Sequence, residues 1–376
     1  MKPDEVFRFQ WPFLLKMLPD LETSSTDFGA IQRKRNVRSA ADLLRLALVY
    51  GYCDRSLRET AAWAASTELA DVSDVALLKR FRQCGAWLGH LLAHLVAERG
   101  KWRSPGNLGM PIRILDATTI AAPGSTGADW RIHLSFDLDR MTISDVLLSD
   151  PKVGESLGRM PLAANDLILA DRGYAHAAEL RAAAEAGAWF LIRLPWRNVP
   201  LIQPDGQPWD LMAFLRGLSD GETAAADVRL SGAGGAIHCR VLAVRKTEPA
   251  AQQSRERALR DNGRKGKDID PRTLEAAGYT FLITNLPADR LTPDAGLELY
   301  RYRWQIELAF KRLKSLLHID HLRAKEPKLA QTYITAKLIG ALLIDELTQR
   351  HLGFSPWGFP IQSANGLNLA DAASVQ

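Results

Sequence analysis

The chain has 376 residues, of which 47% are hydrophobic and 24% charged, so it is too long for one small core and has the composition of a soluble globular protein. Its net charge of +5 favours polyanionic partners only mildly. Three cysteines that lie far apart exclude a disulfide framework and a paired-cysteine zinc site, and they suit a reducing cytoplasm. The N-terminus lacks the apolar core of a signal peptide, and charged residues interrupt the apolar stretch 334–347, which excludes a membrane span there.

Residues 1–38 are mixed in character, and 39–100 are predicted to be helical. Ser39 begins a strongly helical run, Ser56-Leu57-Arg58-Glu59 is a capping box before a second helix, and Asp74 opens a third. Basic residues precede the first helix or lie on the third: Arg33, Lys34, Arg35, Arg38, Lys79, Arg80 and Arg82. Two interpretations fit equally, a helix-turn-helix DNA reader and a plain helical bundle with an arginine-bearing surface. A linker rich in Gly and Pro is expected at 101–111.

Two apolar stretches that have the pattern of buried strands each carry an aspartate near or directly after their end. The first is 112–120, with Asp116, and the second is 167–170, followed by Asp171. An aspartate beside an apolar strand is costly unless it is paired, capped or metal-bound. For Asp116 alone, a hydrogen-bonded structural role is the simpler interpretation.

The strands around these two acids predict a mixed sheet. Stretches 130–138 and 142–148 indicate an antiparallel meander with the first strand. The helix expected at 177–186 and the strand at 187–193 complete a βαβ unit, so the strands of that unit should be parallel. Sheets of this kind place ligands at the carboxyl ends of their strands.

Residues 196–275 break the pattern. Stretches 223–230 and 236–245 predict a hairpin, and the polar stretch 255–267 is rich in Arg and Lys. We expect a β-rich insertion with a solvated basic excursion, after which 279–284 returns as a strand.

The stretch 299–314 is predicted to be one amphipathic helix. Tyr300, Arg303, Glu307 and Lys314 fall within an arc of about 60° at 100° per residue. The neighbouring face is apolar and carries Ile306, Phe310, Leu313 and Leu317. A charged stripe of this kind is equally well a solvated helix face in which Arg303 and Glu307 form an ordinary i,i+4 pair.

The remainder of the chain adds a long helix at about 328–350 and a loose tail. His318 and His321 have no third ligand near them in sequence, so we interpret them as surface or phosphate-contacting groups rather than a metal site. His133 is expected to be structural.

The spacing Tyr-x2-Arg-x3-Glu-x6-Lys, together with the two strand-end acids and Asp171-Arg172-Gly173-Tyr174, resembles the DDE transposases of bacterial insertion sequences with the Tyr-Arg-Glu-Lys signature, the insertion-sequence-four group. The resemblance spans about 112–317. It implies an α/β fold with a ribonuclease H-like core, a mixed sheet flanked by helices, interrupted by an insertion. The domains expected from it are an N-terminal helical DNA-binding domain at 1–105, the first part of the core at 106–195, a β-rich insertion at 196–278, the second part of the core at 279–350 and a flexible tail at 351–376.

The resemblance also implies the site. The catalytic and metal-binding residues would be Asp116, Asp171 and Glu307, holding Mg²⁺ or Mn²⁺ as a pair of ions, since hard oxygen ligands suit these metals. The residues implied to contact DNA are Tyr300, Arg303, Lys314, Lys311 and Arg172. Well-known members of the family have a base-extruding tryptophan before this helix; here that strand begins with Tyr279, a possible substitute.

The expected function is that of an insertion-sequence transposase, which binds terminal inverted repeats and performs metal-dependent DNA cleavage and strand transfer by a cut-and-paste route. Its partners would be double-stranded DNA, both transposon ends and target, and a second copy of itself on paired ends. It would work in the cytoplasm, at the bacterial nucleoid, without a membrane. Two alternatives stay open: a metal-dependent nuclease without strand transfer, and a non-catalytic DNA-binding relative that represses transposition.

Overall fold

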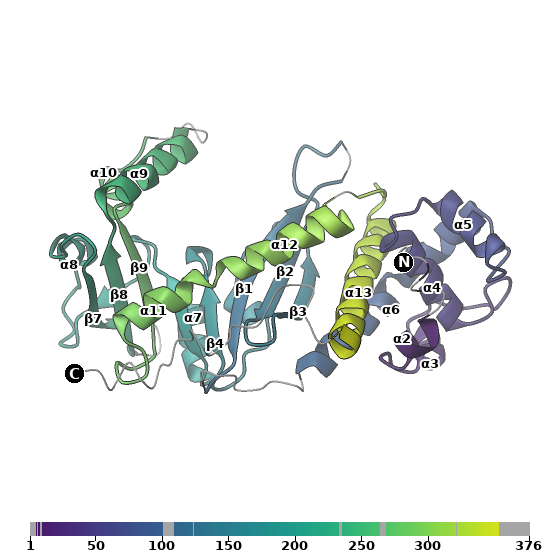
Figure 1. Ribbon diagram of the computed structural model, residues 1–376, viewed down its shortest axis with the longest axis horizontal. Helices are drawn as coiled ribbons and strands as arrows, with labels where there is room; N and C mark the ends of the chain where they lie inside the picture. The colour runs from purple at the N-terminus through teal and green to yellow at the C-terminus, as the bar shows by residue number, and fades with distance from the viewer. Residues whose placement is uncertain are drawn as a thin grey trace.

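The computed structural model describes residues 10–100, 109–122, 124–232, 235–263, 268–320 and 322–352, together with Glu5 and Phe7. The predicted tail at 351–376 and the predicted linker therefore lie largely outside the described residues. The described part is elongated, with helices at one end and a long twisted sheet running away from them (Figure 1). None of the described helices is both long and apolar enough to span a membrane.

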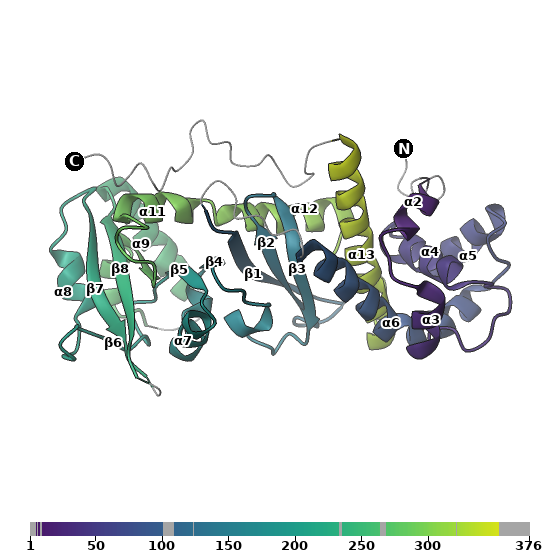
Figure 2. The same ribbon diagram turned by 90° about the horizontal axis from the view of Figure 1, so that it is seen from below.

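The three predicted N-terminal helices form as expected, and two short helices lie within 10–38, where none was predicted. Ser39 Oγ accepts the Asp42 N–H at 3.0 Å, and Ser56 forms a complete capping box with Glu59, which confirms both predicted helix starts. The helices are α2 (Trp11–Leu15), α3 (Leu21–Asp27), α4 (Ala40–Gly51), α5 (Leu57–Ser66) and α6 (Asp74–Gly100). The long C-terminal helix α13 (Pro327–Leu352) packs against α4 and α6, and both α6 and α13 contact the edge of the sheet (Figures 1 and 2).

One nine-stranded sheet forms the centre of the molecule, in the order β3-β2-β1-β4-β5-β9-β8-β7-β6. The strands are β1 (Ile112–Ile120), β2 (Trp130–Asp137), β3 (Thr142–Ser149), β4 (Leu167–Ala170), β5 (Trp189–Arg193), β6 (Leu201–Ile202), β7 (Thr223–Leu230), β8 (Ile237–Arg245) and β9 (Tyr279–Thr284). β1, β2 and β3 pair antiparallel, whereas β1, β4 and β5 are parallel neighbours. The predicted meander, βαβ unit and hairpin are therefore confirmed.

Helices cover both faces of this sheet. α11 (Pro293–Arg301) and α12 (Trp304–Leu317) follow one another along one face, and α7 (Ala177–Glu185) lies on the other (Figures 1 and 2). The apolar stripe predicted on the helix at 299–314 faces the sheet, because Ile306, Phe310 and Leu313 are buried. The strands are thus sandwiched between two hydrophobic layers.

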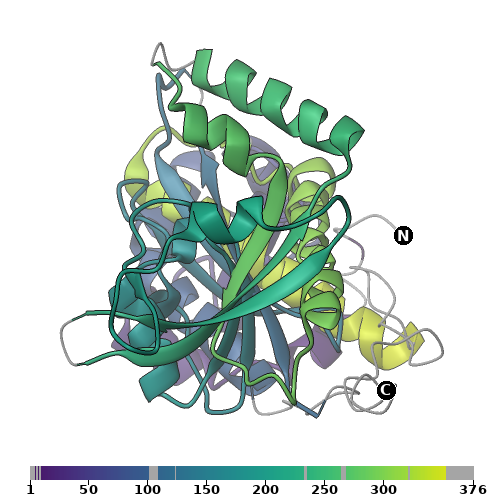
Figure 3. The same ribbon diagram turned by 90° about the vertical axis from the view of Figure 1, so that its left-hand side faces the viewer.

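The region predicted as a β-rich insertion contains strands β6 to β8, but its basic segment, expected as a solvated excursion, is largely helical. Its strands β6 to β8 continue the central sheet beyond β9, and much of the expected excursion is helix α9 (Glu248–Gly263). Two short helices, α8 (Leu211–Arg216) and α10 (Pro271–Ala276), accompany it. α9 and α10 project past the ends of β8 and β9 (Figures 1 and 3). The many charged residues of α9 suggested a solvated irregular segment, although its Ala, Gln, Glu and Arg residues have high helix propensity.

The single helix predicted at 299–314 is also interrupted. α11 ends at Arg301 and α12 begins at Trp304. The intervening Tyr302 and Arg303 keep right-handed dihedral angles, but their N–H groups bond to carbonyls only three residues earlier, at 3.1 and 3.0 Å. This tightening resembles a 3₁₀ turn. The stretch contains no Gly or Pro, so the local sequence does not predict this interruption. The side chains on either side of the turn make contacts with the sheet that are described below.

Candidate active site

Strand pairing brings the two predicted aspartates side by side. β1 and β4 are parallel, and Leu115 is paired with Ala170, so Asp116 and Asp171 occupy the next positions of the same register. Neighbouring strands lie about 4.8 Å apart, and side chains alternate between faces. Ile114 and Leu169, two residues before each acid, belong to the core under α12. Both aspartates therefore lie on the face that α12 covers.

Asp116 is largely buried. Its Oδ1 accepts the Ala117 N–H at 2.8 Å, and its Oδ2 lies 3.9 Å from Nη1 of Arg303. Burial raises the pKa of Asp116 to about 6, because the charged form loses solvation, although the Ala117 N–H and Arg303 both oppose the shift. Glu155 and Glu307 add to the rise through like-charge repulsion.

Arg303 joins the strand acid to the helix acid. Its Nη2 donates to Oε1 of Glu307, one turn along α12, while Nη1 faces Asp116. The guanidinium carbon also lies 6.0 Å from the Tyr300 ring centroid. Asp116 and Glu307, which are far apart in sequence, thus share one cation.

Asp171 follows β4 directly and precedes the 3₁₀ helix η2 (Arg172–Tyr174). Its side chain makes no cap hydrogen bond, and its Oδ1 is buried with no hydrogen-bond partner among the described residues. A buried carboxylate oxygen without a donor is unfavourable unless something else supplies positive charge.

Tyr300 ties the helix to the end of the second acid-bearing strand. Its hydroxyl donates to the carbonyl oxygen of Ala170 at 3.1 Å, directly before Asp171. Burial raises the pKa of Tyr300, with further effects from Arg303 and Asp171. The phenol therefore remains neutral and holds α11 against the carboxyl end of β4.

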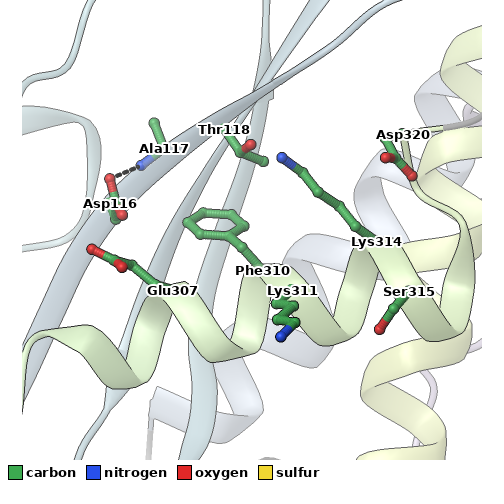
Figure 4. Close-up of a pocket in the computed structure, with 9 residues that line it drawn as sticks. All are labelled: Asp116, Ala117, Thr118, Glu307, Phe310, Lys311, Lys314, Ser315 and Asp320. Carbon is green, nitrogen blue, oxygen red and sulfur yellow. Dashed lines mark hydrogen bonds between the residues drawn. The ribbon is translucent and has the colours of Figure 1, made fainter. Parts of the chain in front are cut away.

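A pocket of about 480 Å³ opens between β1 and α12. Its lining consists of Asp116, Ala117, Thr118, Glu307, Phe310, Lys311, Lys314, Ser315 and Asp320. The carboxylates of Asp116 and Glu307 face one another at one end, and the Lys314 amine points toward Thr118 (Figure 4). The pocket thus combines acids at one end with two lysines along its helix side.

Not every predicted site residue lies in this pocket. Asp171 is beside it on the neighbouring strand, and Arg172 is exposed on η2. Across the part of the chain that the structure describes, no three His, Cys, Asp or Glu side chains gather closely enough to hold one metal ion. The metal-binding role of the three acids therefore stays a prediction.

The remaining predicted residues are placed as follows. His318 ends α12 in a left-handed conformation, with φ 47°, and His321 lies outside the described residues. His133 is buried and bonded to Ser149 at 2.9 Å, as expected of a structural histidine. Tyr279 is buried in the core under α7, where it is poorly available to stack on an extruded base.

Two side chains near the acids escaped the sequence analysis. Glu155, on the loop between β3 and β4, lies against Gly173, so that a Cβ on this glycine would overlap the Glu155 carboxylate. Trp304 opens α12 and is 47% exposed, an unusual position for a large aromatic residue. Gly173 within Asp-Arg-Gly-Tyr was a signal of close approach, but nothing in the sequence indicated which residue approaches it.

Comparison with known proteins identifies the family of this chain. The transposase DDE domain family matches residues 107–343. The transposase for insertion sequence element IS421 of Escherichia coli is 42% identical over 344 residues, covering 90% of this chain and 92% of that protein. The InsL protein of insertion sequence element IS186A of Escherichia coli K12 shows the same identity and coverage over 343 residues.

Two further comparisons are more distant. The transposase for insertion sequence element IS231E of Bacillus thuringiensis is 25% identical over 263 residues, covering 62% of this chain and 55% of that protein. A solved piggyBac transposase synaptic complex with hairpin DNA aligns with 96% of this chain and 82% of its own, at 7% identity and a TM-score of 0.42, a likeness too weak to support a conclusion. From the family match and the 42% identity, this chain belongs to the DDE transposases of insertion sequences, enzymes that cleave DNA and join its strands.

Proposed function

We propose that this chain is the transposase of an insertion sequence, in which Asp116, Asp171 and Glu307 are the catalytic acids. The observation that supports this most strongly is the register of β1 and β4, which aligns Asp116 with Asp171 on the face covered by α12. Glu307 faces Asp116 from that helix (Figure 4). Three acids from two strands and a helix thus approach one region of the sheet.

The residues suit divalent metal. All three acids offer hard carboxylate oxygens, which Mg²⁺ and Mn²⁺ prefer, and the buried Oδ1 of Asp171 has no hydrogen-bond donor among the described residues. When bound, a pair of such ions supplies charge stabilisation to both the attacking and the leaving oxygen of a phosphodiester. The role of the protein is to hold these carboxylates in register and to keep hydrogen-bond donors away from Oδ1 of Asp171.

Cations of the same helix would hold the DNA. Lys311 and Lys314 line the pocket beside Glu307, and Arg303 presents a planar fork that matches phosphate oxygens. Tyr300 is less suited to direct DNA contact than expected, because its hydroxyl is bonded to Ala170 O. Arg172 is exposed near Asp171 and completes the proposed DNA contacts.

The wider assignment follows the family. We assign β1 to β5, β9 and the helices α7, α11 and α12 to a ribonuclease H-like core that 196–278 interrupts, and the helices before residue 105 to DNA binding. Within those helices Arg80 contacts the Arg33 carbonyl and Arg82 pairs with Glu326, so these arginines are partly engaged within the protein. The proposed partners are double-stranded transposon ends and target, bound by a homodimer in the bacterial cytoplasm.

The test separates cleavage from binding. Asp116→Asn, Asp171→Asn and Glu307→Gln should each lower Mg²⁺-dependent cleavage of a transposon-end duplex by at least about 100-fold, the range typical of losing transition-state charge stabilisation. Binding measured by gel shift should stay nearly unchanged, because phosphate affinity comes from cations. Glu185→Gln, an exposed carboxylate at the far end of α7, is the matched control.

The same assay decides between the alternatives. Nicking of the duplex without joining to a target would indicate a nuclease, whereas tight binding with no Mg²⁺- or Mn²⁺-dependent cleavage in the wild type would indicate a repressing relative. Parallel loss of binding and cleavage in all three variants would assign the acids a structural role.

A further inference from the structure

Arg303 stands between two of the carboxylates that the proposed reaction requires. One terminal nitrogen donates to Glu307 Oε1 and the other lies 3.9 Å from Asp116 Oδ2. The side chain is only 19% exposed. Since Tyr300 is fixed to β4 through its hydroxyl and lies beside the guanidinium, the arginine approaches both acids from a firmly held turn.

A divalent cation would need the oxygen atoms that Arg303 faces. Asp116 Oδ1 already accepts the Ala117 N–H, so Oδ2, the oxygen nearest Arg303, is the one with more capacity for another ligand. A guanidinium and a dication also repel each other strongly at a few ångströms in a partly buried site. Metal and Arg303 therefore compete for Asp116 and Glu307.

DNA offers Arg303 a different partner. A guanidinium binds phosphate oxygens with the same two-pronged geometry that it uses for carboxylates. Lys311 and Lys314 line the same pocket and would attract a phosphate to within reach of the arginine. Moving Arg303 from the acids to a phosphate would leave Asp116 and Glu307 without a counter-charge, a state that favours a dication.

We propose that Arg303 couples DNA binding to metal binding: a DNA phosphate draws the guanidinium away from Asp116 and Glu307, and only then do these acids bind metal tightly. The inference rests on the proposed function and adds an order of assembly to it. Coupling of this kind is reciprocal, so metal must tighten DNA binding by the same factor as DNA tightens metal binding. The device would keep the free protein from cutting DNA at random.

The experiment measures Mn²⁺ affinity of the full chain by the electron paramagnetic resonance signal of free Mn²⁺, first without DNA. Arg303→Gln removes both the charge and the fork, whereas Arg303→Lys keeps the charge and removes the fork. Arg303→Gln should bind Mn²⁺ at least about fivefold more tightly than the wild type, within the usual range of coupling between sites, and Arg303→Lys should lie between the two because it keeps the repelling charge. Arg301→Gln is the control, because Arg301 is 77% exposed and pairs with Glu298 on the solvent side.

A second arm adds a short nonspecific duplex, with the duplex alone subtracted as a blank. DNA should tighten Mn²⁺ binding by the wild type and do so much less in Arg303→Gln. Mn²⁺ affinity in Arg303→Gln equal to that of the wild type would overturn the proposed competition, as would an equal effect of DNA on both proteins.

Acid variants distinguish this failure from failure of the proposed function. If Asp116→Asn and Glu307→Gln weaken Mn²⁺ binding while the Arg303 variants leave it unchanged, the metal site stands and the coupling fails. If the acid variants bind Mn²⁺ as the wild type does, the metal site itself is refuted, and the coupling is refuted with it.

Discussion

Strand β1 carries an arginine–carboxylate cluster on each of its faces, and the two differ in how firmly they are locked. Arg113 points away from α12 and is 3% exposed; it bonds to Ser135 Oγ at 2.9 Å and to Asp166 Oδ2 at 3.2 Å, and also reaches the Pro161 carbonyl. Arg303 reaches the other face from a helix and has two carboxylate partners beside an open pocket.

The difference shows what distinguishes a structural ion pair from one that can change partners. A buried arginine whose donors are taken by several groups cannot be released without leaving charges unpaired in the core. An arginine at the rim of a pocket can exchange one anion for another at little cost. Sequence motifs marked the second cluster and gave no hint of the first.

The largest expected effect is on stability and contrasts the two arginines directly. Arg113→Met should lower the free energy of unfolding by about 3–5 kcal/mol, because it leaves Asp166 buried without its counter-charge. Arg303→Met should cost about 1 kcal/mol or less. Urea unfolding of both variants measures the contrast, and similar losses for the two would contradict it.

A second contrast uses the pH dependence of two carboxyl groups, Asp116 in the middle of β1 and Asp139 beside the start of that strand. Burial raises the pKa of Asp116 to about 6, and burial with repulsion from Asp137 does the same for Asp139, which accepts the Ile112 N–H. Since the unfolded pKa is about 3.9, the native state binds more protons between about pH 4 and 6, so the stability contributed by each group falls as the pH rises through that window.

Each Asn substitution should therefore abolish this loss. In metal-free protein, the free energy of unfolding of the variant relative to the wild type should rise by about 2 kcal/mol between pH 4 and pH 7. Unfolding curves at several pH values measure the gain. Only Asp116→Asn should also abolish cleavage; an equal loss of cleavage in Asp139→Asn would erase the distinction between site and scaffold.

A smaller effect concerns DNA contacts on the α12 face. Arg303→Ala and Lys314→Ala should each reduce the slope of log affinity against log salt by about one unit, if each side chain neutralises one phosphate. Arg301→Ala, already paired with Glu298 at 2.9 Å, should leave the slope nearly unchanged. Unaltered slopes in all three variants would return α12 to the interpretation of an ordinary solvated helix.

The smallest expected effect is on stability and tests the close packing of Glu155 against Gly173. Gly173→Ala should cost about 1 kcal/mol, at the low end for overpacking, because the obstacle is the tip of the flexible Glu155 side chain. In a Glu155→Ala background the cost should disappear. A loss of stability that persists in the double variant would place the strain in the backbone instead.

Much of the architecture could be predicted because local signals determine it. The capping box at Ser56, the apolar run around Asp116 and the βαβ spacing around Asp171 each have a direct physical consequence, and the structure confirms the elements that they predict. Helix α9 was missed although its composition favours helix, because its charge suggested solvated chain. The apolar stripe of Ile306, Phe310 and Leu313 identified the face of α12 that meets the sheet.

The sequence by itself determined which residues form strands and helices, and which acids follow apolar strands, because hydrophobic periodicity and capping act over a few residues. Only the tertiary structure decided that β1 and β4 align Asp116 with Asp171, that the helix tightens at Arg303, and that this arginine lies between Asp116 and Glu307. Those outcomes depend on contacts between segments at least 55 residues apart, whose burial and charge no local pattern contains.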